Sequence, residues 1–172
     1  MHREAGYGAR HANSAAMPPL AAALTAALPD LHARCRDPWV VIGSAAAWLV
    51  GADVNVADID VLTSRRDADA LRDCWQARHD AAHRPAGAER FRSRFARYRF
   101  PGLPVEVMGG LEVHGVEGWM ALRIDRIVHV SIAGMSVPVP SVAEQIRVLD
   151  SFGRAKDQAR IHALKTLDEV GK

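Results

Sequence analysis

Long apolar runs are missing from this chain of 172 residues. Even the alanine-rich stretch at residues 20–28 is much shorter than the roughly 20 consecutive apolar residues that span a bilayer. Residues 1–16 lack the apolar core of a secretory signal peptide. The sequence therefore predicts a protein without a membrane span, and we expect it in the cytoplasm.

Cysteine and lysine are also scarce. The two cysteines, Cys35 and Cys74, are far apart and show no metal-ligand spacing, which argues against a disulfide framework or a cysteine-based zinc site. Lysine occurs only at positions 156, 165 and 172, and arginine supplies the remaining positive charge. The formal net charge of +2 gives no overall indication of a nucleic-acid partner.

Several catalytic signatures are absent. The chain has no P-loop, no Gly-x-Ser-x-Gly elbow and no dinucleotide fingerprint, and its eight histidines are scattered without ligand spacing. Its composition is typical of a globular protein, with 49% hydrophobic and 24% charged residues. We expect a flexible leader at residues 1–16 and a single domain at residues 17–172.

The most informative segment lies within residues 39–62. An apolar strand ends in Gly43-Ser44, an alanine-rich helix follows, and the chain returns as a strand that carries Asp58 and Asp60. Because strand side chains alternate between faces, the two aspartates share one face and lie roughly 7 Å apart along the chain. Their repulsion favours a bound cation, and carboxylate oxygens suit Mg²⁺ or Mn²⁺.

This set of residues resembles the core of the DNA polymerase β-like nucleotidyltransferase superfamily. The core pattern is a Gly-Gly or Gly-Ser turn, an Asp-x-Asp pair and a third carboxylate on a neighbouring strand. Gly43-Ser44 matches the turn, Asp58 and Asp60 match the pair, and Glu106 matches the third acid. The resemblance implies an α/β (α+β) nucleotidyltransferase fold, with a mixed β-sheet and flanking helices.

The resemblance also implies a chemistry. Nucleotidyltransferases move a nucleoside monophosphate from a nucleoside triphosphate to an acceptor hydroxyl with the help of two divalent metal ions. Asp58, Asp60 and Glu106 would bind the metal, and Gly43-Ser44 would bind the triphosphate. The acceptor can be a small molecule, RNA or a protein, since small bacterial members include antibiotic adenylyltransferases and toxins of toxin–antitoxin pairs.

A Lys-Asp pair near the start of a late helix is a further feature of such small bacterial proteins. Lys156 and Asp157 match it, which implies that Lys156 faces the active site and contacts phosphate. The alternative is a solvated helix start.

Two departures from the family pattern bear on activity. Asn55 and Ala57 stand where an Arg-x-Ser or Arg-x-Thr often precedes the acid pair, and no second acid follows Asp157. Nucleotide binding would then use another basic residue, such as Arg65 or Arg66. The rival hypothesis is a catalytically weak or inactive binding module of the toxin–antitoxin type.

The candidate residues also have ordinary structural alternatives. Ser44 can be a helix N-cap, Asp60 can pair with an arginine, and Glu106 can be an exposed strand residue. Arginines alternate with apolar residues in the segment 90–99, which predicts either a solvated edge strand or a basic rim that attracts triphosphate or RNA.

The remaining patterns predict the other helices and strands. We expect helices at 18–28 (interrupted at Pro29), 67–78 and 156–170, hairpins at 91–108 and 125–139, and a helix capped by Ser141 and Glu144.

Overall fold

The computed structural model describes residues 17–170, so the leader expected at residues 1–16 lies outside the described part of the chain. The helices are α1 (Met17–Arg34), α2 (Gly43–Leu49), α3 (Arg65–Cys74), α4 (Val142–Phe152) and α5 (Gln158–Val170), with short 3-10 turns η1 (Gln76–Arg78) and η2 (Ala155–Asp157). The strands are β1 (Val40–Ile42), β2 (Ile59–Thr63), β3 (Phe91–Tyr98), β4 (Val105–Gly115), β5 (Gly118–Ala121), β6 (Ile127–Ile132) and β7 (Met135–Pro140).

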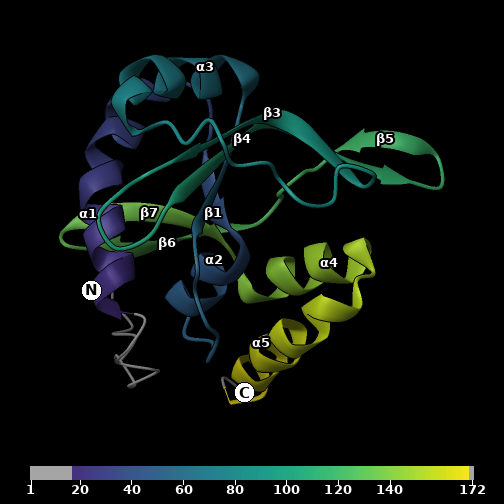
Figure 1. The fold of residues 1–172 in the computed structure, drawn as a ribbon. Helices are drawn as coiled ribbons and strands as arrows, with labels where there is room; N and C mark the ends of the chain where they lie inside the picture. The colour runs from purple at the N-terminus through teal and green to yellow at the C-terminus, as the bar shows by residue number, and fades with distance from the viewer. Residues whose placement is uncertain (1–16, 171–172) are drawn as a thin grey trace.

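A mixed sheet forms the centre of the fold (Figure 1). Its strand order is β1-β2-β4-β3, and β5 pairs with the far part of β4. β2 and β4 run parallel, whereas β1 pairs antiparallel with β2 and β3 pairs antiparallel with β4. β6 and β7 form a separate hairpin. The expected mixed sheet with flanking helices is confirmed.

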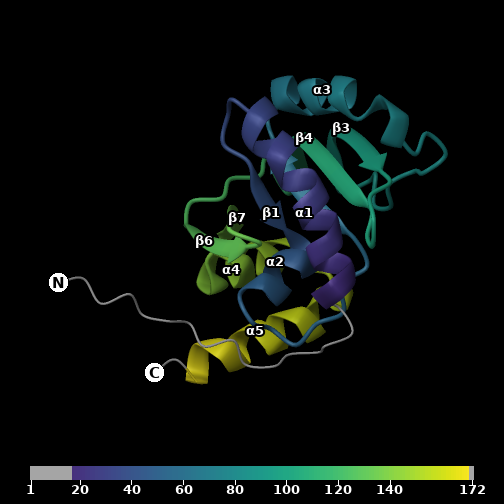
Figure 2. The same ribbon diagram turned by 90° about the vertical axis from the view of Figure 1, so that its left-hand side faces the viewer.

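One face of the sheet forms the main core with α1 and α3. Val41, Val61 and Val107 point into this core and are almost completely buried, together with a stripe of leucines on α1. α1 crosses in front of the strands in Figure 2. The second group of helices, α4 and α5, packs against α2 through a smaller apolar cluster that includes Ala47, Leu149 and Leu164.

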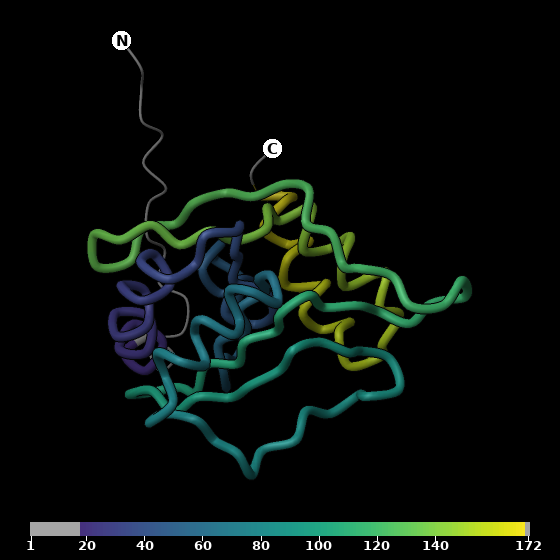
Figure 3. Tube along the Cα trace, turned by 90° about the horizontal axis from the view of Figure 1, so that it is seen from above, coloured from purple at the N-terminus to yellow at the C-terminus, as the bar shows by residue number. Residues whose placement is uncertain are grey.

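The β4–β5 hairpin projects from the body of the molecule (Figures 1 and 3). The sequence pattern predicted neither β5 nor the extension of β4 to Gly115, because the residues near the tip are exposed and lack a buried stripe. Among residues 17–170, no helix has the length and apolar character needed to cross a membrane.

The interruption expected at Pro29 is wrong, because α1 continues through this proline to Arg34. A proline inside a helix leaves the carbonyl four residues earlier without its N–H donor. Here that residue is Thr25, and both Thr25 and Pro29 are exposed, so water can reach the carbonyl. Burial of Leu28 and Leu31 on the opposite stripe favours the continuous helix.

Three expected boundaries also differ from the structure. β2 begins at Ile59, so Asp58 directly precedes the strand. The helix expected at 67–78 is α3 followed by η1, and the helix expected from Lys156 begins at Gln158. Lys156 therefore lies in the 3-10 turn η2.

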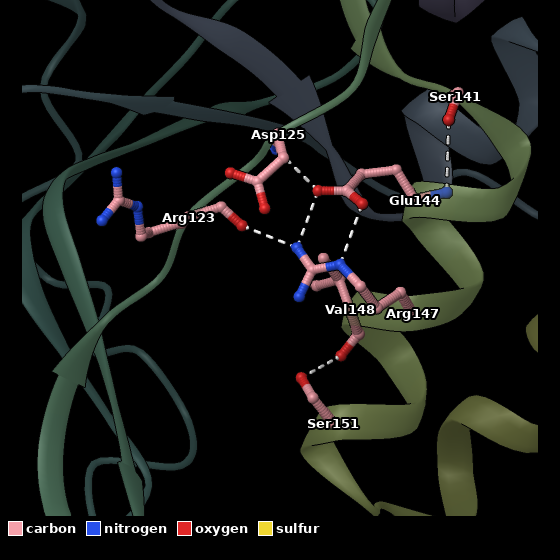
Figure 4. Close-up of polar contacts among 7 residues, drawn as sticks. All are labelled: Arg123, Asp125, Ser141, Glu144, Arg147, Val148 and Ser151. Carbon is pink, nitrogen blue, oxygen red and sulfur yellow. Dashed lines mark hydrogen bonds and ion pairs between the residues drawn. The ribbon is translucent and has the colours of Figure 1, made fainter.

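Of the two hydrogen bonds of the capping box expected at Ser141, only one is formed. The Ser141 hydroxyl accepts a hydrogen bond from the backbone N–H of Glu144 at 3.3 Å. The Glu144 carboxylate does not return to the N-cap but accepts from the backbone N–H of Asp125 and from the Arg147 guanidinium (Figure 4).

Candidate metal centre

Three carboxylates converge at one end of the sheet. Asp60 on β2 is the direct parallel neighbour of Glu106 on β4, and Asp58 lies just before β2. One oxygen of each carboxylate lies within 4.8 Å of the corresponding oxygens of the other two. The convergence expected from the sequence is thus confirmed, although these acids come from segments almost 50 residues apart.

The Gly43 turn lies directly against this cluster. Ile42, at the end of β1, pairs with Asp60, so the following residue begins α2 beside the carboxylate. Gly43 has φ +72°, and a Cβ at this position would lie 2.5 Å from Asp60 Oδ2. Glycine is therefore required here both for its backbone conformation and for the space that Asp60 occupies.

Ser44 is not the N-cap of α2. The N-cap position is Ile42, which makes no side-chain capping bond, and Ser44 is a nearly buried residue within the first turn. The hydrogen bonds found among residues 17–170 include none from its hydroxyl group. Its role as a phosphate ligand stays a prediction.

The acids repel one another and are partly removed from water. Burial, followed by the charges of Asp58 and Glu106, raises the pKa of Asp60 well above its ordinary value. Burial, followed by the charge of Glu106, also raises the pKa of Asp58. A bound cation would offset both effects.

Three basic side chains lie close to the acids. Arg97 Nη1 donates to Glu106 Oε1 at 2.7 Å, and His83 Nε2 lies 3.3 Å from the same oxygen. Arg160 on α5 is close enough to lower the pKa values of both Asp58 and Asp60, although burial and the neighbouring acids outweigh it. The sequence indicated Arg97 only as part of the arginine-rich segment 90–99, and His83 and Arg160 were not assigned to the site.

Arg97 belongs to the arginine-rich segment, and the structure shows what the other arginines do. β3 is an edge strand, and each arginine has a partner within the protein. The pairs are Arg90 with the Phe152 carbonyl, Arg92 with Glu112, Arg94 with Asp69, Arg97 with Glu106 and Arg99 with Asp80. This favours the interpretation of a charged edge strand, and only Arg97 contacts the acid cluster directly.

The two remaining candidate residues have different surroundings. Lys156 is exposed, and the ion pairs of residues 17–170 include none from it, whereas its neighbour Asp157 is buried and bonds to Arg154 at 2.6 and 3.0 Å. Arg65 lines a cavity at the opposite end of β2 from Asp60. Within residues 17–170, no hydrogen bond or ion pair joins either residue to the acids, and their functional roles stay predictions.

The acid cluster fits a divalent cation by its donor set. Asp58, Asp60 and Glu106 offer three hard oxygen ligands, which is the ligand type that Mg²⁺ and Mn²⁺ prefer. The raised pKa values of Asp58 and Asp60 show that their negative charges are unfavourable in the metal-free protein. A bound cation would compensate for these charges.

Comparison with solved structures places this geometry in a known fold. The crystal structure of a candidate nucleotidyltransferase from Thermotoga maritima matches 84% of this chain and 92% of its own, with 25% identity and a TM-score of 0.64. An antigenic nucleotidyltransferase-like protein from Paracoccidioides brasiliensis matches 88% of this chain and 78% of its own, with 15% identity and a TM-score of 0.56. No protein-family model and no curated protein matches the sequence.

The protein therefore has the nucleotidyltransferase fold of the DNA polymerase β-like superfamily, as the resemblance in sequence indicated. On this fold it carries a cluster of three acids that can hold a metal ion.

Proposed function

We propose that the protein is a Mg²⁺- or Mn²⁺-dependent nucleotidyltransferase, which moves a nucleoside monophosphate from a nucleoside triphosphate to an acceptor hydroxyl. The main support is the carboxylate cluster beside the Gly43 turn. One oxygen each of Asp58, Asp60 and Glu106 lies within 4.8 Å of the others. The likeness to a candidate nucleotidyltransferase over most of both chains supports it.

Each residue of the site has a distinct part. Asp58, Asp60 and Glu106 would hold the metal, which stabilises the charge that develops on the transferred phosphoryl group when it is bound. Gly43 lets a phosphate approach the backbone closely, and the Ser44 hydroxyl would donate a hydrogen bond to it. Arg97 would hold Glu106 in place by its 2.7 Å hydrogen bond.

A basic residue on the C-terminal side would neutralise triphosphate charge. Lys156 is the candidate that the family pattern suggests, but Arg160 has the better physical support because its charge already acts on Asp58 and Asp60. Arg160 would thus supply the positive charge that is missing at Asn55. Loss of nucleotide affinity in Arg160→Gln, but not in Lys156→Gln, would assign this role.

A transfer assay tests the proposal. Each labelled nucleoside triphosphate is incubated with the protein, Mg²⁺ or Mn²⁺ and candidate acceptors (hydroxylated small molecules, RNA and proteins), and products are identified by mass. Asp58→Asn/Asp60→Asn should abolish transfer and metal binding, whereas Asp53→Asn, an exposed acid on the same loop, should leave both unchanged. Transfer at the wild-type rate by the double variant would contradict the metal assignment.

The competing proposal is a nucleotidyltransferase-fold binding module without catalysis, of the toxin–antitoxin type. It is favoured by the absence of an arginine at Asn55 and by the Arg97 and His83 contacts that already engage Glu106. A nucleotide at 100 times its Kd should stabilise the protein by about 2.7 kcal/mol in either case. Stabilisation with Mn²⁺ and nucleotide but no product with any acceptor would favour this module.

A further inference from the structure

A concave site of about 480 Å³ lies at the other end of β2 from the acids. This volume is within the range of small-molecule pockets. Its lining includes Leu62 and Gly110 from the sheet, Trp39 just before β1, Arg65 from the start of α3, and Leu122 from the segment that follows β5. Nothing in the chemistry described above uses this cavity.

The cavity and the acids share one face of the sheet. Leu62 follows Asp60 by two residues on β2, so alternation places their side chains on the same side. On β4, Gly110 follows Glu106 by four residues, but the register with β3 shifts between Gly109 and Glu112, so the shared face rests on β2. With a rise of roughly 3.3 Å per residue, these cavity residues lie about 7 and 13 Å from the acids along the strands. A small molecule that extends out of the cavity along β2 would have to span about 7 Å to reach the metal centre.

Two glycines on β4 leave the space that Arg65 occupies in the cavity wall. A Cβ on Gly110, which has φ +63°, would lie 3.0 Å from Arg65 Cγ. A Cβ on Gly109 would lie 2.6 Å from the Cβ of Ala68 and 3.1 Å from Arg65 Cα. The two glycines thus allow the start of α3 and the arginine side chain to lie close against β4.

The charges around the cavity suit an anionic ligand. Glu112, the acid in its lining, pairs with Arg92 at 2.7 Å, and this hydrogen bond, together with the nearby charges of Arg92 and Arg65, lowers its pKa. Arg65 takes part in none of the ion pairs or side-chain hydrogen bonds found between residues 17 and 170. Most of the other lining side chains are aliphatic or aromatic, so the site combines an apolar surface with one available guanidinium group.

Hydrogen bonds of the buried Glu144 and the half-exposed Arg147 hold the remaining wall in place. Leu122, Ile124 and Ile127 line the cavity, and the segment that carries them is tied to α4 by Glu144 and Arg147. The Asp125 backbone N–H donates to Glu144 Oε1 at 2.7 Å, and Arg147 Nη2 donates to the Arg123 carbonyl at 2.9 Å (Figure 4). The wall is therefore held in place without a ligand, which lowers the entropic cost of binding.

The geometry of the proposed reaction indicates which reactant the cavity would bind. In an in-line displacement the attacking and leaving oxygens lie on opposite sides of the transferred phosphorus. Under the proposed function, pyrophosphate leaves beside Gly43-Ser44, which lies at the Asp60 end of β2. The attacking hydroxyl would then approach from the side on which the cavity lies.

We propose that the cavity binds the acceptor, and that the acceptor is a small molecule with an apolar body and a carboxylate or phosphate group held by Arg65. This inference rests on the proposed function. The acceptor oxygen forms a bond to the α-phosphorus while the bond to pyrophosphate breaks, and the hydroxyl proton passes to water. A volume of about 480 Å³ matches a small molecule rather than an RNA or protein surface.

Binding of a simple probe tests the anion preference. We expect 2-naphthoate to shift the NMR signals of the Gly110 amide and the Trp39 indole in a saturable manner, and 2-naphthylmethanol, its neutral counterpart, to bind about tenfold more weakly or worse. Arg65→Met should remove this preference. Arg66→Met is the matched control, because this neighbouring exposed arginine pairs with Asp37 at 2.8 Å. Equal binding of the two probes, or an unchanged Arg65→Met variant, would overturn the proposal.

A second measurement tests whether the bound probe faces the acids. Mn²⁺ bound at the acid cluster should broaden the proton signals of 2-naphthoate, and Asp58→Asn/Asp60→Asn should abolish the broadening while probe binding persists. Bound probe without broadening, in a protein that calorimetry shows to hold Mn²⁺, would overturn the acceptor assignment. Failure of Mn²⁺ to bind at all would instead contradict the proposed function. If ATP shifted the NMR signals of Gly110 and Trp39, the cavity would be a nucleobase site and the inference would be refuted.

Discussion

Arg97 and Glu106 are direct cross-strand partners on β3 and β4, and their side chains are joined by a hydrogen bond of 2.7 Å. One of the three acids of the metal centre thus has a positive partner of its own. A metal ion at this centre would bind a carboxylate that Arg97 already engages. Arg97 therefore stabilises the metal-free protein and at the same time limits its affinity for a cation.

The Arg97→Gln variant should bind Mn²⁺ more tightly than the wild type. Without the guanidinium, Glu106 keeps only His83 as a basic neighbour, at 3.3 Å, and the repulsion among the three acids increases in the metal-free protein. We expect Kd to fall about three- to tenfold in calorimetry without nucleotide, together with a lower melting temperature in EDTA. Arg94→Gln, which removes an arginine paired with Asp69 on the same strand, is the control. Weaker Mn²⁺ binding in Arg97→Gln would show that Arg97 supports the metal site.

Gly43→Ala should disturb the metal centre beyond its cost in stability. The new Cβ would meet Asp60 Oδ2 and force the carboxylate to move. Gly153→Ala is a matched control because Gly153 also has a positive φ, +62°, but a Cβ there has no neighbouring atom within 4 Å. Both variants should lose about 1 kcal/mol of unfolding free energy from backbone strain. Only Gly43→Ala should weaken Mn²⁺ binding, by tenfold or more, and equal metal affinity in both variants would refute this reading of the turn.

Much of the site could be predicted from the sequence because its parts are local patterns. The Gly43 turn, the spacing of Asp58 and Asp60, and the turn before Glu106 each depend on a few consecutive residues. The same holds for the β6–β7 hairpin, which was expected at residues 125–139 and is present. These patterns determine the local backbone. The pairing of β2 with β4, which joins residues distant in sequence, is the part of the site that they do not determine.

The residues that were missed depend on contacts distant in sequence. Arg97 comes from an edge strand and Arg160 from the last helix, and neither has a local pattern that separates it from the other arginines. Arg65, proposed from the sequence as a nucleotide ligand, follows the end of β2 that is opposite to Asp60, and its role stays a prediction. The course of α1 through Pro29 was missed for a related reason, since burial on the opposite stripe decides it.

Asp60→Asn should stabilise the metal-free protein at neutral pH. A carboxyl group with a raised native pKa binds protons more strongly in the folded state than in the unfolded state. Its charge therefore costs stability increasingly as pH rises from the ordinary aspartate pKa, 3.8, through the raised native pKa of Asp60. The neutral amide removes this cost, so in EDTA at pH 7 we expect the variant to gain on the order of 1 kcal/mol.

The pH profile in EDTA and in Mn²⁺ checks this result. Chemical unfolding of the wild type in EDTA should show a decline in stability with rising pH, and the decline should be smaller in Asp60→Asn. Saturating Mn²⁺ should reverse the order of the two proteins, because only the wild type retains all three ligands. Asp53→Asn, at an exposed position, should follow the wild type throughout. A variant that is less stable than the wild type in EDTA would disprove the repulsion argument.

Glu144→Gln should loosen the wall of the cavity and lower stability. Glu144 is buried, with 4% of the residue exposed, and its carboxylate accepts hydrogen bonds from Arg147 and from the Asp125 backbone. The bond with Arg147, assisted by the backbone donors, lowers the pKa of Glu144 to about 2. The amide keeps the shape but loses the charge, so we expect a cost of about 1–3 kcal/mol at pH 7 in chemical unfolding. Amide exchange should accelerate between Arg123 and Ile127.

The pH dependence separates this charge effect from a general packing defect. Because the native pKa of Glu144 lies below the unfolded value, its contribution is complete above the ordinary glutamate pKa, 4.5, and is lost as pH falls toward about 2. The stability difference between wild type and Glu144→Gln should therefore shrink across this interval. Glu117→Gln, at an exposed position in the β4–β5 turn, should show no difference at any pH. A Glu144→Gln deficit that stays constant from pH 7 to pH 2 would show that shape, and not charge, holds the segment against α4.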